Sequence, residues 1–296
     1  MSSYKTRKLK NIIASLLALG CVLVALVPLI SILYEVIARG APAISIEFLT
    51  QRTKSAGEPG SGIGNAIVGS LLLVGYASMM GLPLGILTGI FVSEYGNNSF
   101  GRTIRFFNDV MANFPSIVVG LFAYSLIVTV TGFSLISGSF ALAIIMIPIV
   151  ASTTEEALKM VPNSLREAAL ALGVPQWRTV LKVILSNGRA GLVTGALLAV
   201  ARVAGETAPL ILTAFGNPFW STSPYEPVAA LPLTIFRNAM SPYRDLQEQA
   251  WGAALVLIAL VLTLNVTVRI LTMNRMTNRH KAVKRTWTTL RSSQRT

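Results

Sequence analysis

The sequence predicts an all-α, polytopic membrane protein with six transmembrane helices. Of its 296 residues, 53% are apolar and only 12% are charged, and the mean hydropathy is +0.63. The apolar residues are gathered in long runs, as expected of segments that cross a bilayer. Six runs are near or above the roughly 20 residues that a spanning helix needs: 11–38, 66–93, 111–131, 134–151, 189–215 and 250–273.

The first run follows a short basic segment, residues 1–10, and superficially resembles a signal peptide with a small-residue cleavage site at Ala41-Pro42-Ala43. The apolar core of a signal peptide is only about 7–15 residues long. Residues 11–38 exceed that length, so we expect an uncleaved first helix and a transmembrane domain over 11–273.

The second run carries glycines at every fourth position, Gly81, Gly85 and Gly89. Small residues at this spacing allow a neighbouring helix to approach closely, which predicts a tightly packed helix. The fourth run is the shortest, and glycines and serines within residues 132–139 blur its start.

The fifth run contains charges where a bilayer disfavours them. Arg202 lies near the middle of the apolar stretch 188–215, and Glu206 follows four residues later. On a continuous helix these two residues share one stripe, which then extends to Pro209. Proline cannot donate a backbone hydrogen bond and so leaves a carbonyl free beside the charges.

Charged residues inside a membrane helix are costly and usually line a polar path or pair with each other. We therefore expect an ion translocation pathway that involves Arg202, Glu206, Thr207 and Pro209. The alternative is a structural salt bridge that locks helices together.

The net charge of +13 is not taken as a sign of nucleic-acid binding. The basic residues are concentrated in every second segment outside the apolar runs, and this distribution indicates how the chain is oriented in the membrane. They cluster before the first run, between runs two and three, between runs four and five, and after run six. The opposite side holds only Arg39, Arg52, Lys54, Arg237 and Arg244. The positive-inside rule then places both termini in the cytoplasm. The basic tail, 274–296, is expected to face anionic lipid rather than RNA.

Two segments are predicted outside. Residues 39–64 are polar and rich in turn residues, and their last part, 57–64, suggests flexible backbone before the second run. Residues 216–248 combine several prolines with aromatic residues. This mixture suits either an irregular segment that meets a partner or an aromatic belt at the membrane surface.

The sequence offers little for catalysis or metal binding. Cys21 is the single cysteine and His280 the single histidine, so no disulfide, thiolate cluster or histidine-rich metal site is available within the chain. No Gly-x-x-x-x-Gly-Lys-Ser/Thr loop occurs, so ATP cannot be bound in the P-loop manner. We expect no bound cofactor and no enzymatic activity.

The cytoplasmic loop 152–188 predicts a short helix between two breakers, Pro162 and Pro175. Residues 153–156 and 164–167 both have the form of a capping box, and Gly173 suits the position after a helix end. A helix of about two turns is unstable alone in water. It must therefore dock, either on a partner or on the ends of the chain's own helices.

Four residues of this loop, Glu167, Ala168, Ala169 and Gly173, together with the apolar stretch after them, resemble the EAA loop of ABC-importer permeases. That family usually ends the loop in Ile/Val-x-Leu-Pro, whereas here Ser186 follows Val183-Ile184-Leu185. The resemblance implies the type I permease fold. It also implies that these four residues couple the chain to a cytoplasmic ATPase.

Residues 166–173 and 205–210, with stretches at 62–70, 93–95 and 115–122, are similar to the PstA family of phosphate permeases. The match covers about residues 62–273. It implies import of inorganic phosphate across the plasma membrane by a heterodimer with a PstC-like permease. The implied partners are a PstB-like ATPase dimer, which uses ATP and Mg, and a PstS-like phosphate-binding protein.

Three other functions are compatible with parts of the sequence. Arg202 does not distinguish phosphate from molybdate, sulfate or phosphonate. The chain could instead be a channel or a proton-coupled carrier, with Glu206 as the proton site. A membrane enzyme is disfavoured, because no nucleophile–base cluster lies in or near the membrane segments.

Overall fold

The computed structural model describes the backbone of residues 2–293; the side chains of residues 1–3, 5, 268 and 271–296, which include His280 and the basic tail, lie outside the description. Within the described part the chain is helical throughout, without strands. Among the described residues, five segments are long and apolar enough to cross a membrane, and a bent pair of helices brings the total to as many as six. They involve α1 (Ser2–Gly40), α3 (Gly64–Glu94), α7 (Leu135–Lys159), α10 (Leu185–Ala204) and α13 (Arg244–Ser293).

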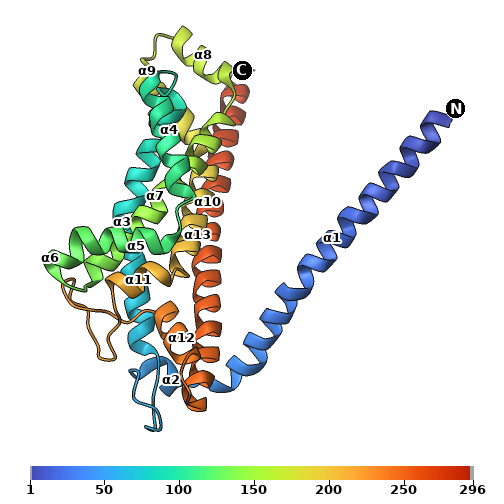
Figure 1. The fold of residues 1–296 in the computed structure, drawn as a ribbon. Coiled ribbons are helices and arrows are strands. Elements are labelled where there is room, and N and C mark those ends of the chain that lie inside the picture. The colour runs from blue at the N-terminus through green and yellow to red at the C-terminus, as the bar shows by residue number, and fades with distance from the viewer. Residues whose placement is uncertain (1, 294–296) are drawn as a thin grey trace.

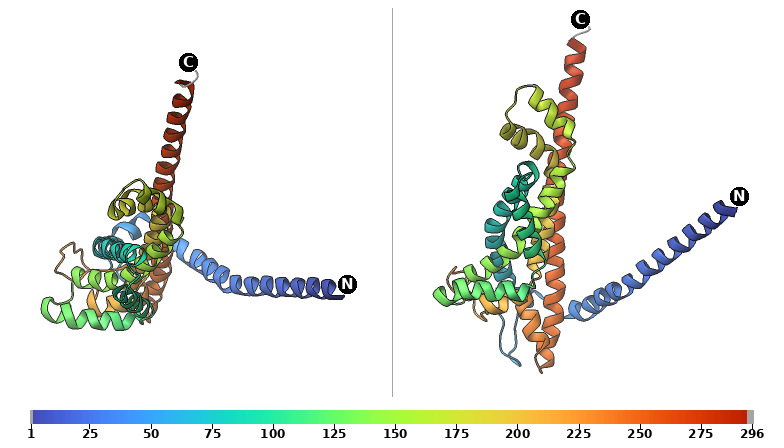
Figure 2. Two further views of the ribbon diagram at one scale, coloured as in Figure 1. Left: turned by 90° about the horizontal axis from the view of Figure 1, so that it is seen from above. Right: turned by 45° about the horizontal axis from the view of Figure 1, so that its top comes forward.

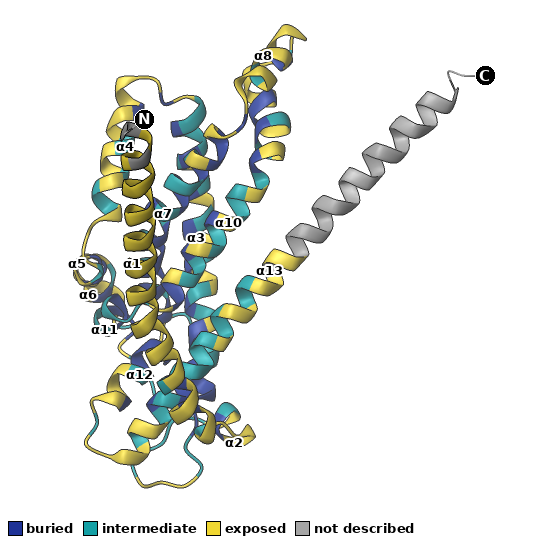
Figure 3. Ribbon diagram, turned by 90° about the vertical axis from the view of Figure 1, so that its right-hand side faces the viewer, coloured by how far each residue is buried: buried dark blue, intermediate teal, exposed yellow. Residues whose placement is uncertain are grey.

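Helix α1 leaves the bundle instead of packing along it (Figure 1 and Figure 2). None of its most apolar window is buried, and Figure 3 shows it exposed along nearly its whole length. Its contact with the bundle lies at its end, where a Cβ on Gly40 would come within 2.7 Å of the Trp251 carbonyl oxygen of α13. The predicted first span therefore exists as a helix with an uncovered apolar surface.

Helices α3 and α7 form the closely packed centre, as the glycine spacing predicts. A Cβ on Gly85 would lie 2.7 Å from the Val150 Cβ, and one on Gly89 would lie 2.6 Å from the Ala151 carbonyl oxygen. The start of α7 is well defined, because the Ser134 hydroxyl accepts a hydrogen bond from the Ser137 amide at 3.2 Å. The fourth predicted span is thus confirmed, and 67% of its apolar window is buried.

The predicted third span, 111–131, is not one continuous helix. This region forms α4 (Ser99–Ala112) and, after a bend of 104°, α5 (Ser116–Ala123), the π-helical η2 (Tyr124–Val128) and the short α6 (Thr129–Thr131). Pro115 explains the bend, because it lacks an amide donor and disfavours helical geometry in the residue before it. Helix α4 starts at Asn98, whose side chain accepts from the Gly101 amide at 2.8 Å.

The loops at the end of the bundle where α1 meets α13 are packed against the helices (Figure 1). Residues 39–64 contain η1 (Ala41–Ala43) and α2 (Ile46–Thr50), and the buried Phe48 and Ile63 join a small apolar cluster with Leu231. Leu231 begins α12 (Leu231–Ala239), a helix that the sequence did not predict within 216–248. Within 57–64, where the glycines suggest flexible backbone, the amides of Gly62 and Gly64 donate to the carbonyls of Arg52 and Gln51.

Candidate functional site

The expected single helix over 189–215 is interrupted. Helix α10 ends at Ala204, Gly205 follows as its C-cap, and α11 (Ala208–Thr213) begins three residues later. Pro209 lies in the first turn of α11, where its missing amide costs nothing. The same proline cannot continue α10, because a helix interior needs that amide. Arg202 therefore lies in the last turn of its helix and not in the middle of a long one.

The predicted charged pair is present at this break. The Arg202 Nε lies 3.7 Å from a Glu206 carboxylate oxygen, so the two side chains form a loose ion pair. They differ in exposure: 57% of the Arg202 side chain is exposed, but only 17% of the Glu206 side chain. The Arg202 side chain is thus largely exposed, and the more buried Glu206 carboxylate supplies a nearby counter-charge.

The other two predicted pathway residues support the break. The Thr207 carbonyl accepts hydrogen bonds from the amides of Leu210 and Ile211 at 3.1 and 3.2 Å, which starts α11. Pro209 is buried against α5, where a Cβ on Gly120 would lie 2.6 Å from its Cα. In this conformation Pro209 packs between helices.

At the other end of the bundle, the predicted short helix is confirmed as α8 (Asn163–Ala171). The Gly173 amide donates to the Leu170 carbonyl, the Val174 amide donates to the Ala169 carbonyl, and Gly173 has a φ of 74°. This pair of bonds is a Schellman ending, which favours glycine. The predicted capping box at Ser164 is not formed, because Pro162 is the N-cap and no side chain caps the helix.

The four predicted coupling residues, three on α8 and Gly173 just after it, differ in exposure. Ala169 is only 8% exposed, so its methyl group packs against the chain itself, while Glu167, Ala168 and Gly173 are exposed. The open apolar surface comes from leucines instead: Leu165 is 37% exposed, Leu170 52% and Leu172 83%.

One arginine holds α8 in place. The Arg166 guanidinium makes two hydrogen bonds to the Glu94 carboxylate, at 2.7 and 3.1 Å, and donates to the carbonyls of Leu158 and Val161 near the end of α7. The hydrogen bond to Glu94 raises the pKa of Arg166 above its ordinary value. Arg166 thereby ties α8 to the ends of both α3 and α7.

A second ion cluster lies nearby, between α4 and α7. The Arg105 Nε and the Lys159 Nζ both contact the same Glu155 oxygen, at 2.8 and 2.6 Å, and Arg105 also donates to the Val92 carbonyl at the end of α3. Sequence reasoning used these basic residues only for orientation. The spacing of Glu155 and Lys159 signals one ion pair, whereas no local pattern reveals Glu94–Arg166 or Arg105–Glu155.

The comparisons with known proteins agree with this architecture. Residues 81–274 match the family model described as "Binding-protein-dependent transport system inner membrane component". The chain is 45% identical over 267 residues to the phosphate transport system permease protein PstA of Yersinia pestis, covering 90% of both chains. It is 39% identical to the probable phosphate transport system permease protein PstA of Methanocaldococcus jannaschii, covering 89% of this chain and 94% of the relative.

Solved structures show the same fold at low sequence identity. A bacterial ABC transporter involved in import of the acidic polysaccharide alginate superposes with a TM-score of 0.63 at 12% identity, covering 93% of this chain and 99% of that chain. The MetNI methionine ABC transporter in an inward-facing conformation gives a TM-score of 0.57 at 19% identity, covering 71% and 92%. The fold is therefore that of an ABC importer permease.

Proposed function

The chain belongs to the family of binding-protein-dependent transport system inner membrane components, and from this premise we propose that it is the permease subunit of an ATP-driven importer of inorganic phosphate. The observation that carries the proposal is the 45% identity to a phosphate permease over 90% of both chains. The chain is a transport subunit and not an enzyme, so ATP hydrolysis, with its Mg, belongs to a partner ATPase.

Arg202 is the residue that we assign to the ion. Phosphate is an oxyanion, and a guanidinium offers several donors in a planar fork that suits it. The 57% exposed side chain of Arg202 leaves most of that fork open, and Glu206 balances its charge when no ion is bound. A site that bound phosphate tightly would not release it, so we assign a weak, transient contact to Arg202 and most of the selectivity to an external binding protein.

Coupling to the ATPase is assigned to α8. This helix is too short to be stable alone, yet two of its leucines, Leu165 and Leu170, and its C-cap residue Leu172 are exposed. A complementary apolar groove on a PstB-like ATPase dimer would cover them. Because Ala169 faces the chain itself, Ala168 and Leu172 supply the contact instead. This role requires the α8 end of the bundle to be cytoplasmic, as the distribution of basic residues predicts.

The remaining partners follow from the same premise. A second, PstC-like permease completes a heterodimer, and the uncovered apolar length of α1 gives it a surface on which to pack. A PstS-like phosphate-binding protein delivers the ion at the end of the bundle opposite α8, near α2 and α12 (Figure 1).

The test is reconstitution of the complete complex in liposomes, with phosphate-stimulated ATP hydrolysis and phosphate uptake measured together. We expect hydrolysis and uptake to require phosphate, the binding protein and the ATPase. Stimulation by molybdate or sulfate in place of phosphate would reassign the substrate. Phosphate uptake by the permease without any ATPase would instead identify a channel or secondary carrier.

Coupling has a separate test on α8. Leu172→Asp should weaken ATPase binding about 10-fold or more, since burying an unpaired carboxylate in an apolar groove is costly. Met160→Asp is the matched control, because Met160 is also exposed, at 77%, and lies at the same end but outside α8. Equal ATPase binding by Leu172→Asp and the wild-type chain would remove α8 from the coupling role.

A further inference from the structure

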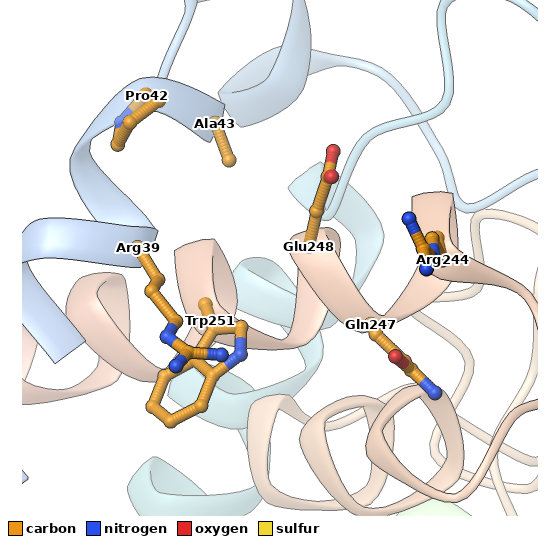
Figure 4. Close-up of a pocket in the computed structure, with 7 residues that line it drawn as sticks. All are labelled: Arg39, Pro42, Ala43, Arg244, Gln247, Glu248 and Trp251. Atoms are coloured by element: carbon orange, nitrogen blue, oxygen red, sulfur yellow. The ribbon is translucent and has the colours of Figure 1, made fainter. Parts of the chain in front are cut away.

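A hollow of about 520 Å³ lies where α1 and α13 meet (Figure 4), at the end of the bundle opposite α8 (Figure 1). It is lined by the last turn of α1, by η1 and by the first turns of α13. Figure 4 shows Arg39 beside Trp251 at one side, Arg244 and Gln247 at the other, and Glu248 between them. None of the translocation or coupling residues lines it.

The charged groups around this hollow are largely without partners. Arg244 and Glu248 make no hydrogen bond or ion pair with any residue that the structure describes. Arg39 bonds to Glu35 through Nε, at 2.6 Å, and its guanidinium lies 5.3 Å from the centre of the Trp251 ring. Its two terminal nitrogens make no hydrogen bond to a described residue. Two guanidinium groups and one carboxylate thus face the same open space.

The hollow is at the depth of lipid headgroups. The apolar run of α13 begins at about residue 250, after a polar first turn that contains Arg244 and Glu248. Arg244 and Glu248 are charged and precede this apolar run, so they lie outside the hydrocarbon. Trp251 lies about 10 Å further along the helix than Arg244, at the boundary where tryptophan is enriched.

The space beside the hollow suits acyl chains. Gly40 and Trp251 hold α1 and α13 in contact at this point, and beyond it the two helices diverge toward the other end of the bundle (Figure 1). The facing surface of α1 is apolar and exposed there, with Leu33 44% and Ile37 48% exposed. A headgroup in the hollow would therefore have its chains in the wedge between two apolar helices.

We propose that this hollow binds the headgroup of a membrane phospholipid that carries a phosphate and a primary amine, such as a phosphatidylethanolamine. The phosphate lies against the guanidinium groups of Arg39 and Arg244, and the amine donates to the Glu248 carboxylate. The lipid then fills the junction of α1 with the bundle and fixes the angle at which α1 leaves it. A free oxyanion is the other source of the same phosphate chemistry, and the experiment separates the two.

The experiment measures lipid binding to the full-length purified chain by native mass spectrometry. Phosphatidylethanolamine, phosphatidylcholine and phosphatidylglycerol with identical acyl chains are titrated in turn. We expect one tightly held phosphatidylethanolamine, bound about 10-fold more tightly than phosphatidylglycerol, because an amine bonded to a carboxylate is a charge-assisted contact. Glu248→Gln should abolish that preference.

The double variant Arg39→Gln/Arg244→Gln should bind the lipid at least 10-fold more weakly. Arg52→Gln is the matched control and should bind normally, since Arg52 is an arginine at the same end that also lies over an aromatic ring, Phe219, but outside the hollow. Unchanged lipid binding in the double variant would overturn the proposal. So would displacement of the lipid by millimolar inorganic phosphate, which would identify the hollow as a site for the free oxyanion.

Discussion

Removing the contact between Glu94 and Arg166 should uncouple α8 without unfolding the membrane helices. The contact joins the end of α3 to α8 through two charge-assisted hydrogen bonds, and only 21% of the Arg166 side chain and 6% of the Glu94 side chain are exposed. The perturbation is a double-mutant cycle of Glu94→Ala, Arg166→Ala and both together.

The magnitude follows from burial and from the remaining partners. Breaking a fully buried ion pair costs about 3–5 kcal/mol. Arg166 is partly solvated and keeps the carbonyls of Leu158 and Val161 as acceptors when Glu94 is removed, so we expect a coupling energy of about 2 kcal/mol. Arg166→Ala should cost more than Glu94→Ala, because it also removes the guanidinium donor from both carbonyls, of which that of Leu158 still accepts the Val161 amide.

The assay is the affinity of the purified ATPase for the permease in nanodiscs, with thermal unfolding of the permease as a second readout. If α8 must be held in position to bind, a loss of 2 kcal/mol corresponds to about 30-fold weaker ATPase binding. The effect should not vary from pH 6 to 9. The pKa of Arg166 is raised, so its stabilising charge is fully present below the ordinary arginine range and is lost only above it.

Arg102→Ala is the control, because Arg102 is exposed at the same end and contacts only Ser99 through its side chain among the described residues. It should leave ATPase binding unchanged. A coupling energy below about 0.5 kcal/mol would place the pair among surface ion pairs of little consequence. That result would refute the claim that it positions α8.

Three further predictions follow from the break, the packing and the orientation. Arg202→Ala should abolish phosphate uptake with the complex still assembled, and Arg202→Lys should leave about a tenth of the rate or less, because a point charge replaces the fork; normal uptake by Arg202→Ala would leave the residue a structural role only. Gly85→Leu should destabilise the permease by about 1–3 kcal/mol or more through overpacking against α7, whereas Gly75→Leu, which meets nothing within 4 Å, should leave its melting temperature nearly unchanged. In a background without the native cysteine, an impermeant thiol reagent applied outside should label Ser221→Cys and not Ser164→Cys, and the reverse pattern would invert the proposed orientation.

Short-range patterns predicted the parts of this structure that depend on neighbours along the chain. The glycine spacing around Gly85 predicts close packing because a helix repeats its faces every three to four residues. The ending of α8 at Gly173 was predictable for the same reason, since a left-handed residue after a helix is read from sequence alone. The position of α8 was predictable, but the pattern does not tell which side of this helix the chain itself covers, and Ala169 lies on the covered side.

Contacts between distant segments were beyond such patterns. Glu94 and Arg166 are separated by 72 positions, and nothing in either local sequence points to the other. Helix α12 was also missed, because prolines and aromatics favoured an irregular segment. Its start at Leu231 depends on a hydrogen bond from the Leu231 amide to the hydroxyl of Ser70, on α3.

The sequence contains signals for the break after α10, but the continuous apolar run favoured a single helix. Gly205 and Pro209 are helix-ending and helix-starting signals, yet the apolar run continues through both. In a membrane such a break requires every freed backbone group to find a partner. Here the Thr207 carbonyl and the buried contact of Pro209 with Gly120 provide the new start. An uninterrupted helix would hold Arg202 and Glu206 on one rigid stripe. The break instead places Arg202 in the last turn of α10 and Glu206 in the connection that follows, so the two charges are not held on one continuous helix.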